Sequence, residues 1–471
     1  MIKYITIIGG GISGLSVLHN LKKKYAGRED IQITLFEAGD HLGGTARTID
    51  QNGFRFETGP NGFLASQPAT LELVDELGIS DKLLVSNEAA KIRYISIADT
   101  LYQLPAGPKD FFRFPLLSFP EKIRILGEFF VPKKNDPLET VFEFGQRRLG
   151  RRFAEIFLDS MVTGIFAGDV KQLHLASAFP KIYNIEQKYG SLFWGMLALA
   201  MKKGRDKERF SVSPRGQLTS FKEGMSQFVS AFGSKYADSI RINHAVKRIS
   251  QKNKRFKIYS KQGEVEADEV FVCAPAYAAA QLLRDFNALT RELEKIPYAS
   301  IAVAGLVYKR SCFKEPPRGF GYLIPSSENR EVLGVLFTSN IFDHRTNTDY
   351  FMFRVMIGGV RHPDIIEKSR DELIVIAKKE LERTFKVYDN PVTEFFSCWH
   401  RGIPQYNREY PQIKKAIEAH VQKIPGLHLA ANYLGGISVN DCILNAQLTI
   451  EQMKPNNTYE VSPKISANDT S

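Results

Sequence analysis

The sequence has little cysteine and no long apolar run. Its four cysteines, Cys273, Cys312, Cys398 and Cys442, lie far apart, and no C-x-x-C pair or histidine spacing joins them into a metal site. Isolated cysteines are typical of buried thiols in a reducing compartment. No stretch is apolar over the roughly 20 residues that a transmembrane helix needs. These absences exclude a disulfide-stapled secreted domain, a zinc module and an integral membrane protein.

The sequence also shows no signal peptide, because its first apolar run, Tyr4–Ile8, is short and leads straight into glycines. The 63 Lys and Arg exceed the 52 Asp and Glu, which gives a net charge of +11. Short basic clusters suit an anionic partner. No recognised nucleic-acid module accompanies them, so we expect no nucleic-acid binding. With 471 residues of ordinary globular composition, we expect a cytoplasmic protein of two or three domains or of one large discontinuous domain.

A dinucleotide-binding pattern opens the chain. The run YITIIGGGISGLSVLHNLKKK predicts a buried strand over Tyr4–Ile8, a glycine turn and then a helix. Gly9 allows the tight turn, Gly11 lets a pyrophosphate approach the backbone, and Gly14 lets the helix pack closely on its strand. The N–H groups at the start of that helix would face the phosphates.

A second strand, IQITLFE, ends in Glu37 at the distance expected for a ribose contact. A carboxylate there favours an adenosine with a free 2′-hydroxyl group. Gly43 and Gly44 follow, where a second close approach to the backbone is expected. No second G-x-G-x-x-G follows a strand, so we expect no separate NAD(P)H domain, and electrons should come from the substrate itself.

The middle of the chain has a different character. The run KDFFRFPLLSFPEKIRILGEFFVPKK places phenylalanines among basic residues, and its prolines limit helices to short pieces. Such a segment either lies on a membrane surface, with Phe111, Phe112 and Phe114 in contact with lipid, or forms a helical cap whose Phe side chains pack inward. Farther along, strand-like runs between 282 and 388 predict an antiparallel sheet with helices, which suits one wall of a substrate cavity.

The segments AGDHLGGTART and FETGPNG resemble the amine-oxidase-like flavoproteins, which bind FAD. The basic residue that usually follows the acid by four positions is His41 here, and Thr45 follows the glycine pair, although Arg47 could substitute. In that superfamily the chain returns at its end to the flavin. The run LGGISVNDCILNA would bring a glycine loop against the flavin ring and aim a helix N-terminus, starting near Ile437–Asn440, at it.

A more specific resemblance comes from six segments: KIRYISIADTLYQLPAG, TGIFAGDV, RGFGYLIPSSENREVLGVLF, VMIGG, IPQY and GGISVNDCI. In order and spacing they are similar to the protoporphyrinogen oxidase family, over nearly the whole chain except the tail. The resemblance implies an α/β fold: a Rossmann-like FAD-binding domain of the amine-oxidase type, an α+β substrate domain and a helical, membrane-facing insertion. The implied boundaries are 1–86, 205–281 and 390–452 for FAD, 87–204 for the insertion, 282–389 for the substrate and 453–471 for a disordered tail.

The resemblance also implies roles for particular residues. It places Arg93 against a substrate propionate, Gly164 as a carbonyl acceptor for a pyrrole N–H, Phe320 and Leu323 around a pyrrole ring, and Met356 near the reacting edge. The implied FAD contacts are Gly9, Gly10, Gly11, Ile12, Ser13, Gly14, Glu37, Ala38, Gly44, Thr45, Ala46, Arg47, Gly59, Pro60, Asn61, Gly62, Val246, Trp399, Asn432, Ile437, Ser438 and Val439.

The expected reaction is the six-electron oxidation of protoporphyrinogen IX at one flavin, with oxygen or a quinone as the acceptor. Oxidation of coproporphyrinogen III is the first alternative, and an Arg at position 93 favours the former substrate. Amine oxidation, carotenoid desaturation and a non-catalytic prenyl-protein escort use the same fold. The intact glycine pattern with Glu37 argues against the escort. Peripheral contact with the inner face of the cytoplasmic membrane, and a monomer or homodimer, complete the expectations.

Overall fold

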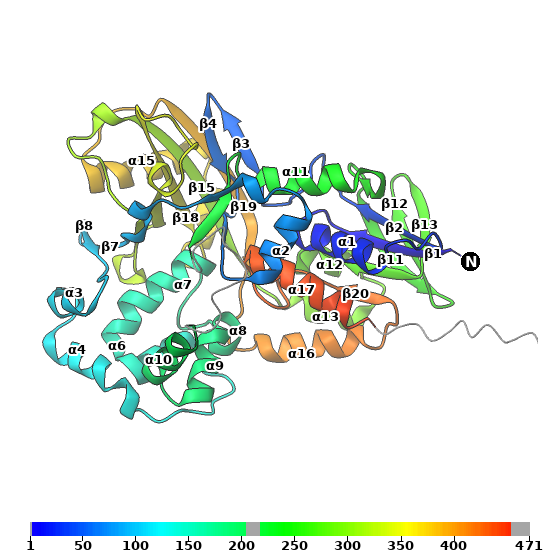
Figure 1. The fold of residues 1–471 in the computed structure, drawn as a ribbon, viewed down its shortest axis with the longest axis horizontal. Coiled ribbons are helices and arrows are strands. Elements are labelled where there is room, and N and C mark those ends of the chain that lie inside the picture. Colours follow the sequence, from blue (N-terminus) through cyan, green and yellow to red (C-terminus); the bar gives the residue numbers. More distant parts are fainter. Residues whose placement is uncertain (1, 204–216, 454–471) are drawn as a thin grey trace, which may run out of the picture.

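Two β-sheets of different kinds lie toward opposite ends of the molecule (Figure 1). The computed structural model describes residues 2–203 and 217–453. Met1, residues 204–216 and residues 454–471 fall outside it, so the start of the expected segment 205–281 and nearly all of the expected tail lie outside the described residues.

The first sheet is parallel and has five strands in the order β10-β2-β1-β14-β20. Its strands are β10 (Ile240–Arg241), β2 (Ile31–Phe36), β1 (Lys3–Ile8), β14 (Glu269–Val272) and β20 (Leu427–Leu429). The strand expected before the glycine loop is confirmed as β1, and the second expected strand, which leads to Glu37, is confirmed as β2. Because the strands come from four distant parts of the sequence, this half of the molecule is discontinuous along the chain.

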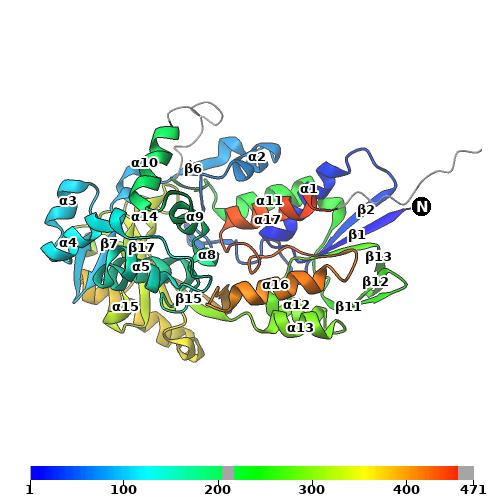
Figure 2. The same ribbon diagram turned by 90° about the horizontal axis from the view of Figure 1, so that it is seen from below.

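Helices and a small meander cover the two faces of the parallel sheet (Figure 2). One face carries α1 (Ile12–Lys24), α2 (Pro68–Glu76), α11 (Met225–Lys235) and α17 (Val439–Glu451). The other carries β11 (Val246–Lys252), β12 (Arg255–Ser260), β13 (Gly263–Ala267), α12 (Ala276–Leu282), α13 (Asn287–Glu294) and α16 (Tyr410–Val421). Helix α1 presents Leu15, Leu18 and Leu21 to the core, at the spacing of one helix face.

The second sheet has seven strands in the order β19-β15-β18-β17-β16-β7-β8. They are β7 (Tyr94–Ile97), β8 (Thr100–Gln103), β15 (Tyr298–Lys309), β16 (Gly321–Leu323), β17 (Val332–Phe337), β18 (Tyr350–Gly358) and β19 (Thr393–Pro404). All pairs are antiparallel except β16 with β7. Helix α15 (Arg370–Phe385) covers one face, and Ser369 with Glu372 forms the capping box at its start.

The opposite face of the second sheet meets the loops that lead to the first. The hairpin β3 (Thr48–Gln51) and β4 (Phe54–Glu57) lies there, with Phe56 stacked on Phe395 of β19 at a ring distance of 4.9 Å. Gly305 of β15 makes room for this ring, because a Cβ at Gly305 would lie 2.4 Å from Phe56. A small sheet of β5 (Phe63–Leu64), β9 (Leu218–Phe221) and β6 (Leu83–Val85), together with α14 (Thr338–Ile341), completes this side.

Short helices form the remaining region, at the lower left of Figure 1. They are α3 (Pro108–Arg113), α4 (Phe119–Leu126), α5 (Val141–Leu149), α6 (Arg151–Phe153), α7 (Asp159–Phe166), α8 (Leu175–Ala178), α9 (Pro180–Tyr189) and α10 (Leu192–Lys203). Three prolines stand in the first turns of α3, α4 and α9, where proline fits a helix. None of the described helices combines the length and apolarity that crossing a bilayer requires.

The expected α/β class is confirmed, but two segments join a sheet outside the region expected for them. The hairpin β7–β8 was assigned to the helical insertion, yet β7 pairs with β16 and extends the seven-stranded sheet. Strand β19 was assigned to the FAD-binding part, yet it pairs with β15 in the same sheet. The domain boundaries therefore stay predictions, and these pairings cross two of them.

Candidate active site

The glycine loop between β1 and α1 has one open position. Gly9 has a φ of +107°, and a Cβ at Gly14 would lie 1.9 Å from the Gly9 carbonyl oxygen, so both are needed for the turn itself. A Cβ at Gly11 would meet nothing within 4 Å. Gly11 is also the N-cap of α1, and no side chain caps the first N–H groups of this helix. The loop therefore leaves backbone donors and space for an anion at Gly11.

The Glu37 carboxylate closes this loop from the end of β2. Its Oε2 accepts a hydrogen bond from Gly10 N at 2.6 Å, and its Oε1 accepts one from Gly39 N at 2.7 Å. The Glu37 carbonyl oxygen accepts from His244 N, which brings the start of β11 and Val246 to the same corner. Ala38 is exposed there. Sequence reasoning thus placed Glu37, Ala38 and Val246 around one nucleotide corner, and the structure brings them together.

Two further loops stack behind the glycine loop. Gly43 N donates to the Gly10 carbonyl oxygen, and a Cβ at Gly44 would lie 3.5 Å from the Gly11 Cα. A Cβ at Gly59 would lie 2.2 Å from the Thr45 carbonyl oxygen. Of the other residues expected in these loops, Ala46 is buried, Arg47 is exposed, Pro60 is half-buried, and a Cβ at Gly62 would collide with the Thr219 carbonyl oxygen. The loops 43–47 and 57–62 are therefore in contact, as the resemblance requires.

The seven-stranded sheet holds the 57–62 loop with two side chains. Trp399 Nε1 of β19 donates to the Thr58 carbonyl oxygen at 2.9 Å. Arg354 of β18 donates to the carbonyl oxygens of Glu57 and Gly59, each at 2.7 Å, and to Asn61 Oδ1 at 3.0 Å. Burial lowers the pKa of Arg354 to about 10. Sequence reasoning missed Arg354, although it stands two residues before Met356 on the same face of its strand.

The glycine pair Gly435–Gly436, before α17, makes room for two side chains of that helix. A Cβ at Gly435 would lie 2.5 Å from the Asn445 amide, and one at Gly436 would lie 2.4 Å from the Asp441 carboxylate. Both partners belong to α17, so the glycines make room for the helix's own side chains. Ser438 is the N-cap, and it forms a capping box with Asp441.

The residues around this turn are firmly placed. The Asn432 carbonyl oxygen accepts a hydrogen bond from Tyr406 Oη, which also accepts one from Gly436 N. Val439 is buried against the core of α1, together with Ile12, whereas Ile437 is half-buried and Ser438 is exposed. Contact of Ile437 and Ser438 with the flavin ring stays a prediction.

The five residues expected at the substrate form two groups. Leu323 and Met356 lie in one row across the sheet with Gly164 against it, and Arg93 and Phe320 form a pair. Leu323 pairs with Gly334, and Gly334 pairs with Met356, so the three lie in register across β16, β17 and β18. A Cβ at Gly164 of α7 would lie 2.9 Å from Leu323 Cδ1. The Arg93 guanidinium lies over the Phe320 ring, at 4.9 Å from its centroid. Leu323 and Phe320 are three residues apart, so β16 links the row to the pair.

An ion pair fixes α7 against this wall. Asp159 Oδ2 accepts hydrogen bonds from Arg361 Nη2 at 3.0 Å and from Ser326 N at 2.6 Å, and Arg361 Nη1 donates to the Ile324 carbonyl oxygen. Burial raises the pKa of Asp159 and lowers that of Arg361. The pair connects the helix that carries Gly164 to the segment that follows Leu323.

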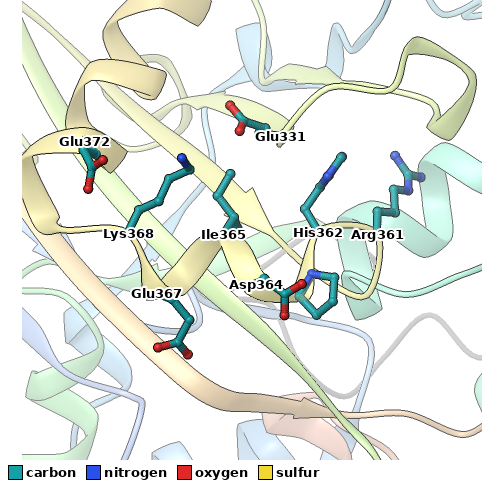
Figure 3. Close-up of a pocket in the computed structure, with 9 residues that line it drawn as sticks. Glu331, Arg361, His362, Asp364, Ile365, Glu367, Lys368 and Glu372 are labelled. Atoms are coloured by element: carbon teal, nitrogen blue, oxygen red, sulfur yellow. The ribbon is translucent and has the colours of Figure 1, made fainter.

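Arg361 also borders an open hollow of about 610 Å³ (Figure 3). The remaining lining comes from Glu331, residues 362–365, Glu367, Lys368 and Glu372, and none of the residues predicted for the site is among them. Both acidic and basic side chains line the hollow. It contains no residue of the Leu323–Gly334–Met356 row, of the glycine loop or of the loops 43–47 and 57–62. Among the described residues, no group of His, Cys, Asp and Glu side chains could hold a metal ion.

Residues 12–452 match the family described as flavin containing amine oxidoreductase. The chain belongs to this family. The open Gly11, the uncapped start of α1 and the Glu37 corner fit the adenosine and pyrophosphate of FAD, and FAD is the cofactor. The expectation of an FAD-dependent oxidoreductase is confirmed.

Within the family, this chain is similar to enzymes named for porphyrinogens. It is 30% identical to protoporphyrinogen oxidase of Bos taurus, over 93% of this chain and 96% of that protein. It is 29% identical to protoporphyrinogen oxidase 2 of Arabidopsis thaliana (94% and 92%) and 27% identical to coproporphyrinogen III oxidase of Bacillus subtilis (94% and 96%). The resemblance to protoporphyrinogen oxidases is therefore confirmed.

Solved structures show the same fold. A crystal structure from Exiguobacterium superposes with a TM-score of 0.81 at 24% identity, covering 95% of this chain and 98% of that one. Reduced UDP-galactopyranose mutase superposes with a TM-score of 0.70 at 14% identity, covering 96% of each chain.

Proposed function

We propose that this flavoenzyme oxidises a porphyrinogen, protoporphyrinogen IX in preference to coproporphyrinogen III. The observation that carries the proposal is the apolar row of Leu323, Gly334 and Met356 beside the exposed cation Arg93. A nearly neutral macrocycle with carboxylate arms requires such a wall and such a charge. The names of the relatives point to the same substrates.

The chemistry asks little of acid or base groups. A bridge C–H of a porphyrinogen is activated by the two pyrroles that flank it, so the protein mainly has to hold that carbon in place. Bound FAD supplies the acceptor for two electrons in each step. Leu323 and Met356 exclude water and set the height of the macrocycle, and the Gly164 carbonyl oxygen accepts a pyrrole N–H.

Arg93 has the charge that a propionate needs. Its guanidinium is exposed, and among the described residues no carboxylate forms an ion pair with it. Its planar fork can bind a carboxylate through two hydrogen bonds, while its contact with the Phe320 ring orients it. Arg93 thereby connects recognition of the substrate arms to the ring that packs against the macrocycle.

The proposal is tested by giving the purified enzyme protoporphyrinogen IX and coproporphyrinogen III in parallel and following porphyrin fluorescence. We expect faster oxidation of the first. A preference for coproporphyrinogen III would keep the reaction and change the substrate. Oxidation of neither by FAD-loaded protein, with both oxygen and a soluble quinone supplied, would contradict the proposal.

We further propose that the helical region makes peripheral contact with a membrane. Rings from α10 and the 3₁₀ turn Gly127–Phe130 meet, where Phe129 contacts Phe130, Phe193 and Trp194. We call the exposed apolar side chains of α3, α4, this turn and α10 the apolar rim; they are Phe112, Phe119, Ile123, Leu126, Phe129, Phe130, Phe193, Trp194, Met196, Leu197, Leu199 and Met201. Exposed basic residues, among them Lys109, Arg113, Lys133 and Lys134, flank it in the sequence and suit anionic lipid.

The structure corrects the residues expected to touch lipid. Phe114 is only 3% exposed and packs against Phe157, so it belongs to the interior of this region. Phe119 and Phe130 are 68% and 80% exposed and were not singled out from the sequence. The two alternatives, lipid contact and inward packing, thus apply to different phenylalanines of the same segment.

Flotation with vesicles of anionic lipid tests this contact. The double variant Phe119→Ser/Phe130→Ser should float less than the parent protein. Tyr388→Ser is the matched control, because Tyr388 is 72% exposed and lies outside the apolar rim. Equal flotation of all three proteins would show that the rim does not bind lipid.

A further inference from the structure

Arg354 is a half-buried cation whose hydrogen bonds go to neutral atoms. Its two terminal nitrogens donate to the carbonyl oxygens of Glu57 and Gly59 and to Asn61 Oδ1. Its Nε is buried and has no hydrogen-bond partner among the described residues. Also within the described chain, no carboxylate forms an ion pair with it.

The neighbouring carboxylate is already engaged. Glu57 Oε1 lies 3.2 Å from Arg345 and accepts from Met225 N, and its Oε2 accepts from Thr48 Oγ1. The charges of Glu57 and Arg345 therefore cancel, and Arg354 leaves this half-buried site with one net positive charge. An unbalanced charge that is partly removed from water is costly, so a site that keeps one is suited to an anionic ligand.

The position of Arg354 selects which anion this is. Successive contacts lead from Gly11 through Gly44 and Thr45 to Gly59 and then to Arg354, so two loops separate Arg354 from the pyrophosphate position. On the other side, β17 and β16 lie between β18 and the Arg93 end of the sheet. Arg354 stands on the same face of β18 as Met356, between the nucleotide loops and the substrate wall.

We infer that Arg354 supplies the positive charge that balances the flavin ring when it is reduced. Removal of a hydride equivalent, two electrons and one proton, from a bridge C–H adds one negative charge to the flavin ring and leaves one positive charge on the substrate. The substrate then loses a pyrrole N–H proton to solvent. The fixed charge of Arg354 favours the state in which the ring carries the extra electrons. The inference rests on FAD as the cofactor and is independent of the proposed substrate.

The test uses the FAD-loaded enzyme and measures properties of the flavin rather than turnover. The first is the two-electron equilibrium of the flavin against a reference dye. The second is the dissociation constant of sulfite, which forms an anionic adduct with oxidised flavin. For Arg354→Met we expect the equilibrium constant for flavin reduction to fall at least tenfold, which is about 30 mV for a two-electron couple. We also expect the dissociation constant of sulfite to rise at least tenfold. Arg354→Lys keeps the charge and should stay within threefold of the parent enzyme.

Two further variants separate charge from structure. Thr58→Val removes the hydrogen bond from Thr58 Oγ1 to the Thr45 carbonyl oxygen and loosens the same loop without changing a charge, so both flavin properties should be retained. Arg354→Gln keeps a donor for the loop and loses the charge, so it should behave like Arg354→Met. Unchanged flavin properties in the neutral variants, with a raised KM, would assign Arg354 to the substrate and overturn the inference.

If the neutral variants release FAD, the apoproteins still give an answer. The dissociation constants of oxidised and reduced FAD are then measured separately, because their ratio reports the same equilibrium. We expect the neutral variants to lose at least tenfold more affinity for reduced than for oxidised FAD. An equal loss for both forms would make Arg354 a structural residue only.

Discussion

Two arginines without water-exposed ion pairs show opposite charge balance in two regions of the molecule. In the helical region, Arg148 is fully buried and forms ion pairs with Glu128 and Glu186, each at 2.6 Å. Beside the cofactor loops, Arg354 has carbonyl and amide oxygens as partners and no carboxylate among the described residues. The charge of Arg148 is neutralised by carboxylates of the same helical region, which it joins. The charge of Arg354 remains available to a ligand, so charge balance separates a structural arginine from a functional one.

Arg148→Met should have the largest effect on stability. Removing Arg148 leaves the buried Glu128 carboxylate without a counter-charge and Glu186 with Arg147 alone, which costs about 3–5 kcal/mol. Urea unfolding of the helical region measures this loss, and the flavin properties of any folded protein should not change. Arg151→Met is the control, because its ion pair with Glu155 is exposed to solvent and contributes little to stability. Equal stability of the two variants would break the comparison.

Arg93 extends the comparison to an exposed arginine with no ion-pair partner in the described chain. Arg93→Ala should raise KM for protoporphyrinogen IX about tenfold to a hundredfold, since a charge-assisted hydrogen bond is worth about 1.5–3 kcal/mol. Arg93→Lys keeps the charge and loses the planar fork, so its KM should lie between those of the parent enzyme and Arg93→Ala. Steady-state kinetics gives these values, and FAD content should be normal throughout. An unchanged KM in Arg93→Ala would remove Arg93 from the substrate site.

Two glycines of one loop repeat the contrast between structure and function. Gly14→Ala brings a Cβ to 1.9 Å from the Gly9 carbonyl oxygen and should cost about 1–3 kcal/mol of stability even without FAD. Gly11→Ala meets no protein atom within 4 Å, and its φ of −71° suits alanine. It should therefore leave apoprotein stability unchanged within about 0.5 kcal/mol and weaken FAD binding at least tenfold. Normal FAD affinity in Gly11→Ala would mean that the phosphates lie elsewhere.

The smallest expected effect concerns a buried group that gives up its charge. Burial lowers the pKa of His19, which contacts Glu76 and Tyr236. Between that lowered pKa and 6.5 the unfolded chain binds the extra proton, so stability rises with pH in this window and levels off above it. The slope is at most about 1.4 kcal/mol per pH unit for one proton. Urea unfolding between pH 5 and 8 should show a shallower slope for His19→Asn than for the parent protein; equal slopes would contradict the assignment.

Local patterns predicted the nucleotide corner well. A glycine loop, its two strands and Glu37 are close in sequence, and their geometry follows from spacing alone. The hairpin β7–β8 was placed in the helical region because its partner β16 is more than two hundred residues away in the sequence and nothing local indicates the pairing. Phe114 and Phe130 look alike in the sequence, although one is buried and the other exposed.

Arg354 shows a different limit. Strand alternation places Arg354 on one face with Met356. Its proposed role depends on something else, the absence of a counter-charge among the described residues. That property depends on Glu57 pairing with Arg345, and two distant segments must be brought together before it exists. The glycines before α17 show another limit: their pattern indicated a flavin contact, which stays a prediction, whereas nothing local indicated that side chains of the same helix also need the space.

The order of the strands in the parallel sheet affects how the protein is made. Strand β1 is synthesised first, yet β14 beside it and β20 at the edge come much later, and α17 packs on α1 only at the end. A ribosome that has released only the first half of the chain holds the glycine loop with β2 and the Glu37 carboxylate, but without β14, β20 and α17. The parallel sheet and its helical layer are therefore completed only when the last described helix emerges.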